Sequence, residues 1–199
     1  MDNILVAVPD VSPDAAPDVG EDAAVVHARG FLAALGVRID SPGTTDTPRR
    51  MAEAYKALLS SDEFDMTTFP NDEGYDEMVI VKDIPVRSLC EHHILPFIGV
   101  AHVGYLPGNR ILGLSKFARV VEMFARRPQV QERLTVQVAD WLVASLAPRG
   151  VGVVIEAEHM CMTLRGVQAT GASTSTSALR GLLRERPQSR AEFLAGIQR

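Results

Sequence analysis

Two pairs of strand-like segments, separated by two helix-like segments, set the tightest limit on the fold of this 199-residue chain. Apolar and β-branched runs predict four strands, over residues 78–85, 97–106, 151–165 and 168–177. Between the two pairs, apolar stripes at helical spacing predict two consecutive helices over residues 115–146, with Ser115 as the first cap and an interruption at Pro128. This order favours an α+β fold with an antiparallel sheet over a doubly wound fold.

Helical patterns also precede the first strand and follow the last one. Helical spacing of apolar residues from Glu21 onward predicts a helix that Gly36 ends. Thr47, as an N-cap followed by Pro48, begins a second helix.

Three other segments complete the pattern. Residues 1–20 hold three prolines and four aspartates with little periodicity, which predicts a flexible leader. The polar residues 61–77 predict a loop. Ser189 and Glu192 stand at capping-box spacing, which predicts a short terminal helix.

The charge balance and the cysteine count exclude several classes of protein. With 20 Lys and Arg against 25 Asp and Glu, the net charge of −5 argues against a duplex-binding surface, so an anionic ligand must be met by a local group of cations. No run of roughly 18 apolar residues suggests a membrane span and no signal-peptide pattern is visible, so we expect a cytoplasmic protein. The two cysteines, Cys90 and Cys161, are too few for a disulfide scaffold and suit a metal site.

Cys90 and His93 are separated by two residues, a spacing that lets a thiolate and an imidazole reach one metal ion. If the strand over 151–165 continues to its end, alternation places His159, Cys161 and Arg165 on one face. A sheet that brings Cys161 beside Cys90 and His93 would then form a Cys₂His site with a fourth position left for water, as in catalytic zinc enzymes.

Each part of this pattern also has a structural interpretation. Two distant cysteines are more often inert buried thiols, and only their combination with the histidines favours a metal site. His92 and His159 remain available for proton transfer once His93 is a ligand, whereas His102 is interpreted as a surface or core histidine. The zinc-deaminase pattern is absent, which argues against that class of hydrolase.

A second group of residues is cationic and local. Lys116 and Arg119 follow Ser115 in the first turn of a predicted helix, where free backbone N–H groups already favour a phosphate. Arg50 and Arg165 are candidates for the same ligand. For three further arginines we prefer a solvated helix surface: Arg126, Arg127 and Arg133. Glu132 has two open roles, since a carboxylate can bind the N1–H and 2-amino group of guanine or simply complement a helix dipole.

Four ordered motifs in these segments resemble GTP cyclohydrolase I of the zinc-dependent type. They are Ser88–His93 (SLCEHH), Gly113–Arg119 (GLSKFAR), Arg126–Thr135 (RRPQVQERLT) and His159–Gly166 (HMCMTLRG). The resemblance extends from about Ala23 to the C-terminus, and it is strongest from Asp76 to Gly181.

The resemblance implies a tunnelling fold: a four-stranded antiparallel sheet with two helices between the hairpins, preceded by a helical N-terminal extension. The expected regions are a leader (1–20), the extension (21–75) and the catalytic domain (76–199). It further implies a homodecamer with active sites at subunit interfaces, binding neither nucleic acid nor membrane.

The implied activity converts GTP and water to 7,8-dihydroneopterin triphosphate and formate, the entry to tetrahydrofolate or related pterins. Carried onto this sequence, the roles fall into three groups. The zinc ligands are Cys90, His93 and Cys161. The catalytic residues are His92, His159, Gln131 and Ser115, with Gln131 beside Glu132 at the guanine end. The ribose and triphosphate contacts are Ser115, Lys116, Arg119, Arg165 and Arg50. Glu53 stands where some members carry a lysine that contacts phosphate.

Two other classes of function remain open at this stage. One is a related tunnelling-fold enzyme that acts on another purine or pterin, although the nitrile-reducing branch would not need the Cys-Glu-His-His segment. The other is a binding or regulatory module that binds GTP and releases no formate. A redox switch, in which Cys90 and Cys161 form a disulfide after metal loss, is compatible with the geometry expected of the ligands.

Overall fold

A computed structural model describes residues 21–198, which divide into two compact units, residues 21–60 and residues 61–198. The predicted leader, residues 1–20, lies outside the described residues. In the part of the chain that is described, no helix has the length and apolar character needed to cross a membrane.

The smaller unit consists of the helices α1 (Glu21–Ala34) and α2 (Thr47–Leu59). Gly36 ends α1 as predicted, because it adopts a φ of 74° that glycine tolerates without steric cost. Helix α2 carries Pro48 in its first turn, but its N-cap is Asp46 and not Thr47. The reason is that the Asp46 carbonyl already accepts the first helical bond, from the Arg50 N–H at 3.0 Å.

The larger unit contains a five-stranded sheet in the order β5-β2-β3-β6-β7. Its strands are β2 (Val79–Cys90), β3 (Leu95–Leu106), β5 (Pro128–Gln129), β6 (Gly150–His159) and β7 (Thr174–Gly181). The four long strands pair antiparallel, which confirms the predicted α+β class and the pairing of the strands two by two. The last strand was predicted over residues 168–177 and is instead Thr174–Gly181. The two-residue strand β5 was not predicted, and it pairs in parallel with the end of β2.

A second, two-stranded sheet pairs β1 (Thr68–Pro70) with β4 (Arg110–Leu112). The prediction of a loop over residues 61–77 is therefore wrong at β1. Three residues are too few to show the alternation on which a strand prediction depends.

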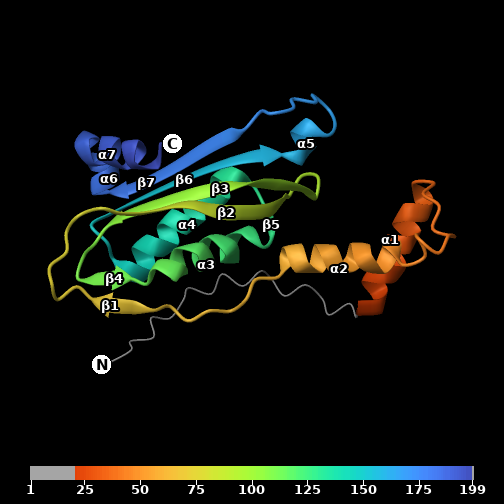
Figure 1. Ribbon diagram of the computed structural model, residues 1–199, viewed down its shortest axis with the longest axis horizontal. Coiled ribbons are helices and arrows are strands. Elements are labelled where there is room, and N and C mark those ends of the chain that lie inside the picture. The colour runs from red at the N-terminus through yellow and green to blue at the C-terminus, as the bar shows by residue number, and fades with distance from the viewer. Residues whose placement is uncertain (1–20, 199) are drawn as a thin grey trace. The chain divides into compact units, whose positions relative to one another are not determined.

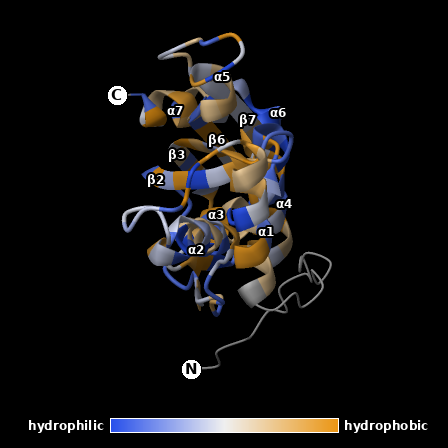
Figure 2. Cartoon of the chain, turned by 90° about the vertical axis from the view of Figure 1, so that its right-hand side faces the viewer, coloured by the Kyte–Doolittle hydropathy of each residue, from blue (hydrophilic) through white to orange (hydrophobic). Residues whose placement is uncertain are grey.

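Helices α3 (Leu114–Ala125) and α4 (Gln131–Leu146) cover one face of the large sheet, and the terminal helix α7 (Pro187–Ile197) covers the other (Figures 1 and 2). Strand alternation explains the two layers. Tyr105 of β3 packs toward α3, with its ring 5.5 Å from that of Phe117. Its neighbour Gly104 faces α7, where a Cβ atom would lie 2.6 Å from the Phe193 ring.

Two predicted helix caps differ from the structure. The N-cap of α3 is Gly113, so Ser115 lies inside the first turn. The terminal helix begins at Pro187 after the N-cap Arg186, so Ser189 and Glu192 do not form a capping box. In both cases a backbone-extended residue precedes the helix, and no side chain caps it.

Candidate metal centre

Cys90 is the last residue of β2, and His93 lies in the tight turn that follows. The N–H groups of His93 and Ile94 both donate to the Cys90 carbonyl, at 3.2 and 2.8 Å. This turn folds His93 back over the strand end and brings its Nδ1 to 3.7 Å from Cys90 Sγ. The predicted strand over residues 78–85 is thus too short, because its pairing with β3 continues to Cys90 opposite Leu95.

Cys161 follows the end of β6 and lies near Cys90 and His93. The prediction of a strand from 151 to 165 is wrong beyond His159, where the pairing with β3 ends at Phe97. Without a strand partner, residues Met160–Thr163 wind into the short helix α5, so the expected alternation past His159 does not hold. Cys161 is nevertheless adjacent to Cys90, since β3 joins β2 to β6 in the sheet.

The ligand atoms of Cys90, His93 and Cys161 all lie within 4.8 Å of one another, so this group could hold a metal ion. Ligands of one tetrahedral zinc, at roughly 2.0–2.3 Å from the ion, lie about 3.3–3.8 Å apart. Burial, followed by the nearby Cys90 thiol, raises the pKa of Cys161. A cation would reverse that effect because it stabilises both thiolates. The donor set therefore fits a zinc ion.

His92 and His159 flank the three candidate ligands. His92 has a side chain that is 64% exposed, with Nδ1 3.7 Å from Cys90 Sγ. His159 is partly buried, and its ring stacks on Phe97 with centroids 4.6 Å apart. Burial lowers the pKa of His159, while the charge of Glu132 opposes that shift. Burial therefore favours the neutral form of the His159 imidazole.

Gln131 and Glu132 open α4 beside this centre but differ in environment. The amide of Gln131 is 1% exposed, and its Oε1 lies 2.7 Å from His159 Nε2. Glu132 is exposed in the same first turn. Only Glu132 of this pair is thus accessible to a ligand in solution.

An ion pair between Arg133 and Glu91 was not predicted from the sequence. Arg133 Nη2 donates to Glu91 Oε2, and its Nε donates to Gln129 Oε1 at 2.9 Å. The hydrogen bond from Arg133 lowers the pKa of Glu91. The pair ties the turn between Cys90 and His93 to α4.

The preference for solvated arginines is also wrong at two other positions. Arg126 bonds Glu122 at 3.1 Å with a side chain that is 18% exposed. Arg127 donates to the Met123 carbonyl at 3.0 Å, and its guanidinium lies 5.5 Å from the centre of the Phe124 ring. The position of these arginines on an amphipathic helix pattern did not predict the contacts. His102 is a core residue, 3% exposed, and it accepts the Asp83 N–H at 3.2 Å.

Ser115, Lys116 and Arg119 lie in the N-terminal half of α3, whereas the C-terminal end of α3 adjoins β2 near Cys90. Twelve residues of helix span about 18 Å. The single chain therefore does not bring the start of α3 to the metal centre.

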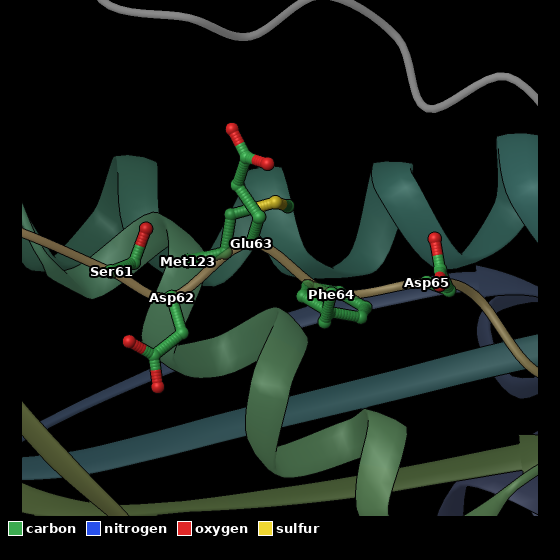
Figure 3. A pocket seen from close by; sticks show the side chains of 6 residues that line it. All are labelled: Ser61, Asp62, Glu63, Phe64, Asp65 and Met123. Atoms are coloured by element: carbon green, nitrogen blue, oxygen red, sulfur yellow. The ribbon is translucent and has the colours of Figure 1, made fainter.

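The two cations of α3 instead face the segment before β1. Arg119 pairs with Asp62 at 3.2 Å, and Lys116 Nζ lies 5.7 Å from the centre of the Phe64 ring. Asp62 and Phe64 also line a cavity of about 460 Å³ with Ser61, Glu63, Asp65 and Met123 (Figure 3). Its three carboxylates do not suit a triphosphate.

Arg165 and Arg50 occupy different surroundings. Arg165 is exposed after α5, and its charge acts on Cys161 to oppose the rise in the pKa of that thiol. Arg50 lies on α2 in the smaller unit, with Asp46 at 3.8 Å. Glu53 pairs with Arg49 at 2.8 Å.

Comparisons with known proteins agree on one family. The family model described as GTP cyclohydrolase I matches residues 24–198. A GTP cyclohydrolase 1 from Mycolicibacterium gilvum is 52% identical over 188 residues, which are 92% of this chain and 93% of the relative. One from Streptomyces griseus is 53% identical over 182 residues, covering 89% and 90% of the two chains. One from Thermoanaerobacter pseudethanolicus is 51% identical over 173 residues, covering 85% and 92%.

Proposed function

The chain belongs to the GTP cyclohydrolase I family, and we propose that it hydrolyses and rearranges GTP to 7,8-dihydroneopterin triphosphate with release of formate. The product would enter tetrahydrofolate or related pterin synthesis. The observation that carries this proposal is the convergence of Cys90, His93 and Cys161 within 4.8 Å, although Cys90 ends β2 and Cys161 lies in α5, 71 residues later in the sequence. The resident metal in this proposal is zinc.

A zinc ion held by these three side chains would supply Lewis-acid chemistry, because it lowers the pKa of a water at the position that the protein leaves open. The protein supplies the positioning and the proton transfers. Two hydrolytic steps break the C8 bonds of the purine and release formate. The ribose then rearranges to a ketose, and the freed amine closes on its carbonyl with loss of one water. The sum consumes one water for each GTP, and it needs no electron carrier.

His92 and His159 carry the protons in this scheme. His92 is exposed beside the ligands, so it can protonate N7 of a bound purine as the ring opens. Burial lowers the pKa of His159 and so favours its neutral form, which can accept a proton during the sugar rearrangement. Glu132 accepts hydrogen bonds from the guanine N1–H and 2-amino groups, which fixes the purine relative to both histidines.

We assign the triphosphate contacts to more than one copy of the chain. Ser115 and Lys116 lie about 14–15 Å along α3 from the end that adjoins the metal centre, and Arg119 lies about 9 Å from it. An oligomer with active sites at subunit interfaces would place the start of α3 from one copy beside the metal centre of another. We assign Arg165 to the same triphosphate, and Arg50 as a further contact. The assembly proposed is the homodecamer.

The test is incubation of the purified protein with GTP and Zn²⁺ under reducing conditions, with formate and the fluorescence of the oxidised pterin measured together. The proposal expects the two products in equal amounts. Binding of GTP without formate release would instead indicate a binding module. The variant His92→Ala should keep its zinc and lose roughly 10²–10⁴ in turnover.

A further inference from the structure

Gln131 combines a buried position with an unusually complete set of polar contacts. Its amide nitrogen lies 3.0 Å from the Ile155 carbonyl, 2.9 Å from the Thr174 carbonyl and 3.1 Å from Thr176 Oγ1. Its amide oxygen faces His159 Nε2 at 2.7 Å. The side chain, 1% exposed, thus has both amide hydrogens and its oxygen engaged by the protein itself.

The two backbone carbonyls determine which way the amide points. A carbonyl oxygen only accepts hydrogen bonds, so the NH₂ group must face Ile155 and Thr174. The opposite orientation would place three oxygens against one another and leave the amide hydrogens against the imidazole. Oε1 is therefore the atom presented to His159.

Two threonine hydroxyls close a ring of hydrogen bonds on the same glutamine. Thr135 Oγ1 donates to the Gln131 carbonyl at 2.8 Å, which uses its single hydrogen. Thr176 Oγ1, at 2.7 Å, must then donate to Thr135 Oγ1, and its lone pair, 3.1 Å from the Gln131 amide nitrogen, shares one of the two amide hydrogens with a carbonyl. Each hydroxyl has one consistent direction, so the network reinforces a single orientation of the amide.

This orientation fixes the proton on His159. Because Oε1 of Gln131 only accepts, His159 Nε2 must carry the hydrogen, and in the neutral ring Nδ1 is then the bare nitrogen. Stacking on Phe97, with ring planes 12° apart, restrains the ring plane as well. The Gln131 amide thus determines the tautomer of His159, and the Phe97 ring restrains the plane of its imidazole.

We propose that Gln131, supported by Thr135 and Thr176, is a positioning residue that holds His159 as the Nε2–H tautomer and leaves Nδ1 as the bare nitrogen of the neutral ring. The role of this atom in turnover rests on the proposed function, whereas the tautomer itself does not. The assignment differs from a direct contact between Gln131 and guanine, because no hydrogen of the amide is left for a substrate.

The experiment compares two buried glutamines that lie two residues apart. Gln131→Leu removes the amide that faces His159, and Gln129→Leu removes an equally buried amide that bonds the Phe124 carbonyl, Gln137 and Arg133, so it controls for loss of a buried amide beside the same centre. Zinc-loaded proteins labelled with ¹⁵N-histidine are examined by NMR at a pH where the ring is neutral, since protonated and bare ring nitrogens have separate shifts. Steady-state turnover of GTP is measured in parallel.

The wild type and Gln129→Leu should show only Nε2–H at His159, and Gln131→Leu should show both tautomers. For Gln131→Leu, kcat should fall by about 10- to 100-fold, within the contribution of general acid–base catalysis, while KM changes little. A wild-type His159 protonated at Nδ1, or the same tautomer mixture in Gln129→Leu, would overturn the proposal. A large rise in KM with kcat unchanged would also overturn it, because it would indicate that Gln131 contacts the substrate.

Thr176→Val and Thr176→Ser provide a milder pair in case Gln131→Leu does not fold. Thr176→Val should raise the Nδ1–H fraction, and Thr176→Ser, which keeps the hydroxyl, should restore the wild-type spectrum. A Thr176→Val spectrum identical to the wild type would contradict the role of the threonines. If the wild type shows the expected tautomer and yet releases no formate from GTP, the proposed function fails and the tautomer assignment stands.

Discussion

Arg133 and Glu91 form an ion pair that joins the first turn of α4 to the turn between Cys90 and His93. Arg133 is held in place by Gln129 and the Pro128 carbonyl, so the pair connects β5, α4 and the candidate metal ligands. Support of this kind restricts the positions that the ligands can adopt before an ion binds.

Arg133→Met should therefore weaken zinc binding by about tenfold, the lower end of what outer contacts contribute to metal sites. Competition with a chromophoric chelator measures the affinity. Arg126→Met is the matched control, since it removes an ion pair with Glu122 within α3 and should leave zinc affinity unchanged. Equal losses in the two variants would contradict the role of Arg133.

Asp62→Asn should lower the KM for GTP. Asp62 pairs with Arg119, which we assign to the triphosphate, and the carboxylate competes with that ligand. Exposed ion pairs contribute roughly 0.2–1 kcal/mol, which corresponds to about a 1.4- to 5-fold change in KM. Glu63→Gln removes a carboxylate from the same cavity without touching this pair, and it should leave KM closer to the wild-type value. A KM that rises in Asp62→Asn would argue against a phosphate contact at Arg119.

Tyr105 should make the fold sensitive to alkaline pH. Burial raises the pKa of Tyr105 above its ordinary value of 10.0. Between the unfolded and the folded pKa, the unfolded chain has lost a proton that the folded chain keeps, so the free energy of unfolding falls as the pH rises above about 10. Below pH 10 this contribution is fully present.

Tyr105→Phe should remove that alkaline loss. At neutral pH it should cost about 1–3 kcal/mol, because the buried Leu112 N–H loses the hydroxyl that it contacts at 3.2 Å. Denaturant unfolding between pH 7 and pH 11 measures both effects. If the variant loses stability above pH 10 as steeply as the wild type, another group is responsible.

Gly152→Ala should destabilise the sheet against α7. A Cβ atom there would lie 2.6 Å from the Phe193 ring and 2.8 Å from Leu183, both fully buried. Overpacking of this kind costs about 1–3 kcal/mol. Gly30→Ala is the matched control in α1, where nothing lies within 4 Å, and it should gain about 0.5–1 kcal/mol of helix stability. Urea unfolding of both variants checks the contrast.

The sequence predicted the long strands and the helices between them because each depends on a local pattern, and the spacing of Cys90 and His93 predicted that these two side chains lie close together. Cys90 and His93 lie within four consecutive residues, so only the turn after Cys90 is needed to bring their side chains together. The predicted grouping of Cys161 with Cys90 and His93 agrees with the structure, but the reason given was partly wrong, since the β6 pairing ends at His159 and α5 carries the cysteine.

Contacts between distant segments could not be predicted in the same way. The Gln131 amide depends on carbonyls of β6 and β7, and the Arg133 contact depends on where β5 pairs, so neither has a local signal. The solvated interpretation of Arg133 followed from its exposed helix position alone. Ser115 and Lys116 likewise gave no indication that the single chain keeps them near the opposite end of α3 from the metal centre.

In the proposed function, one zinc ion held by Cys90, His93 and Cys161 is required for GTP hydrolysis. The most direct measurement determines zinc per chain and formate released per GTP, under reducing conditions, in the wild type and in Cys161→Ala. We expect one zinc per chain with stoichiometric formate in the wild type, and loss of both in Cys161→Ala. Formate release at the wild-type rate by a zinc-free Cys161→Ala protein would contradict it.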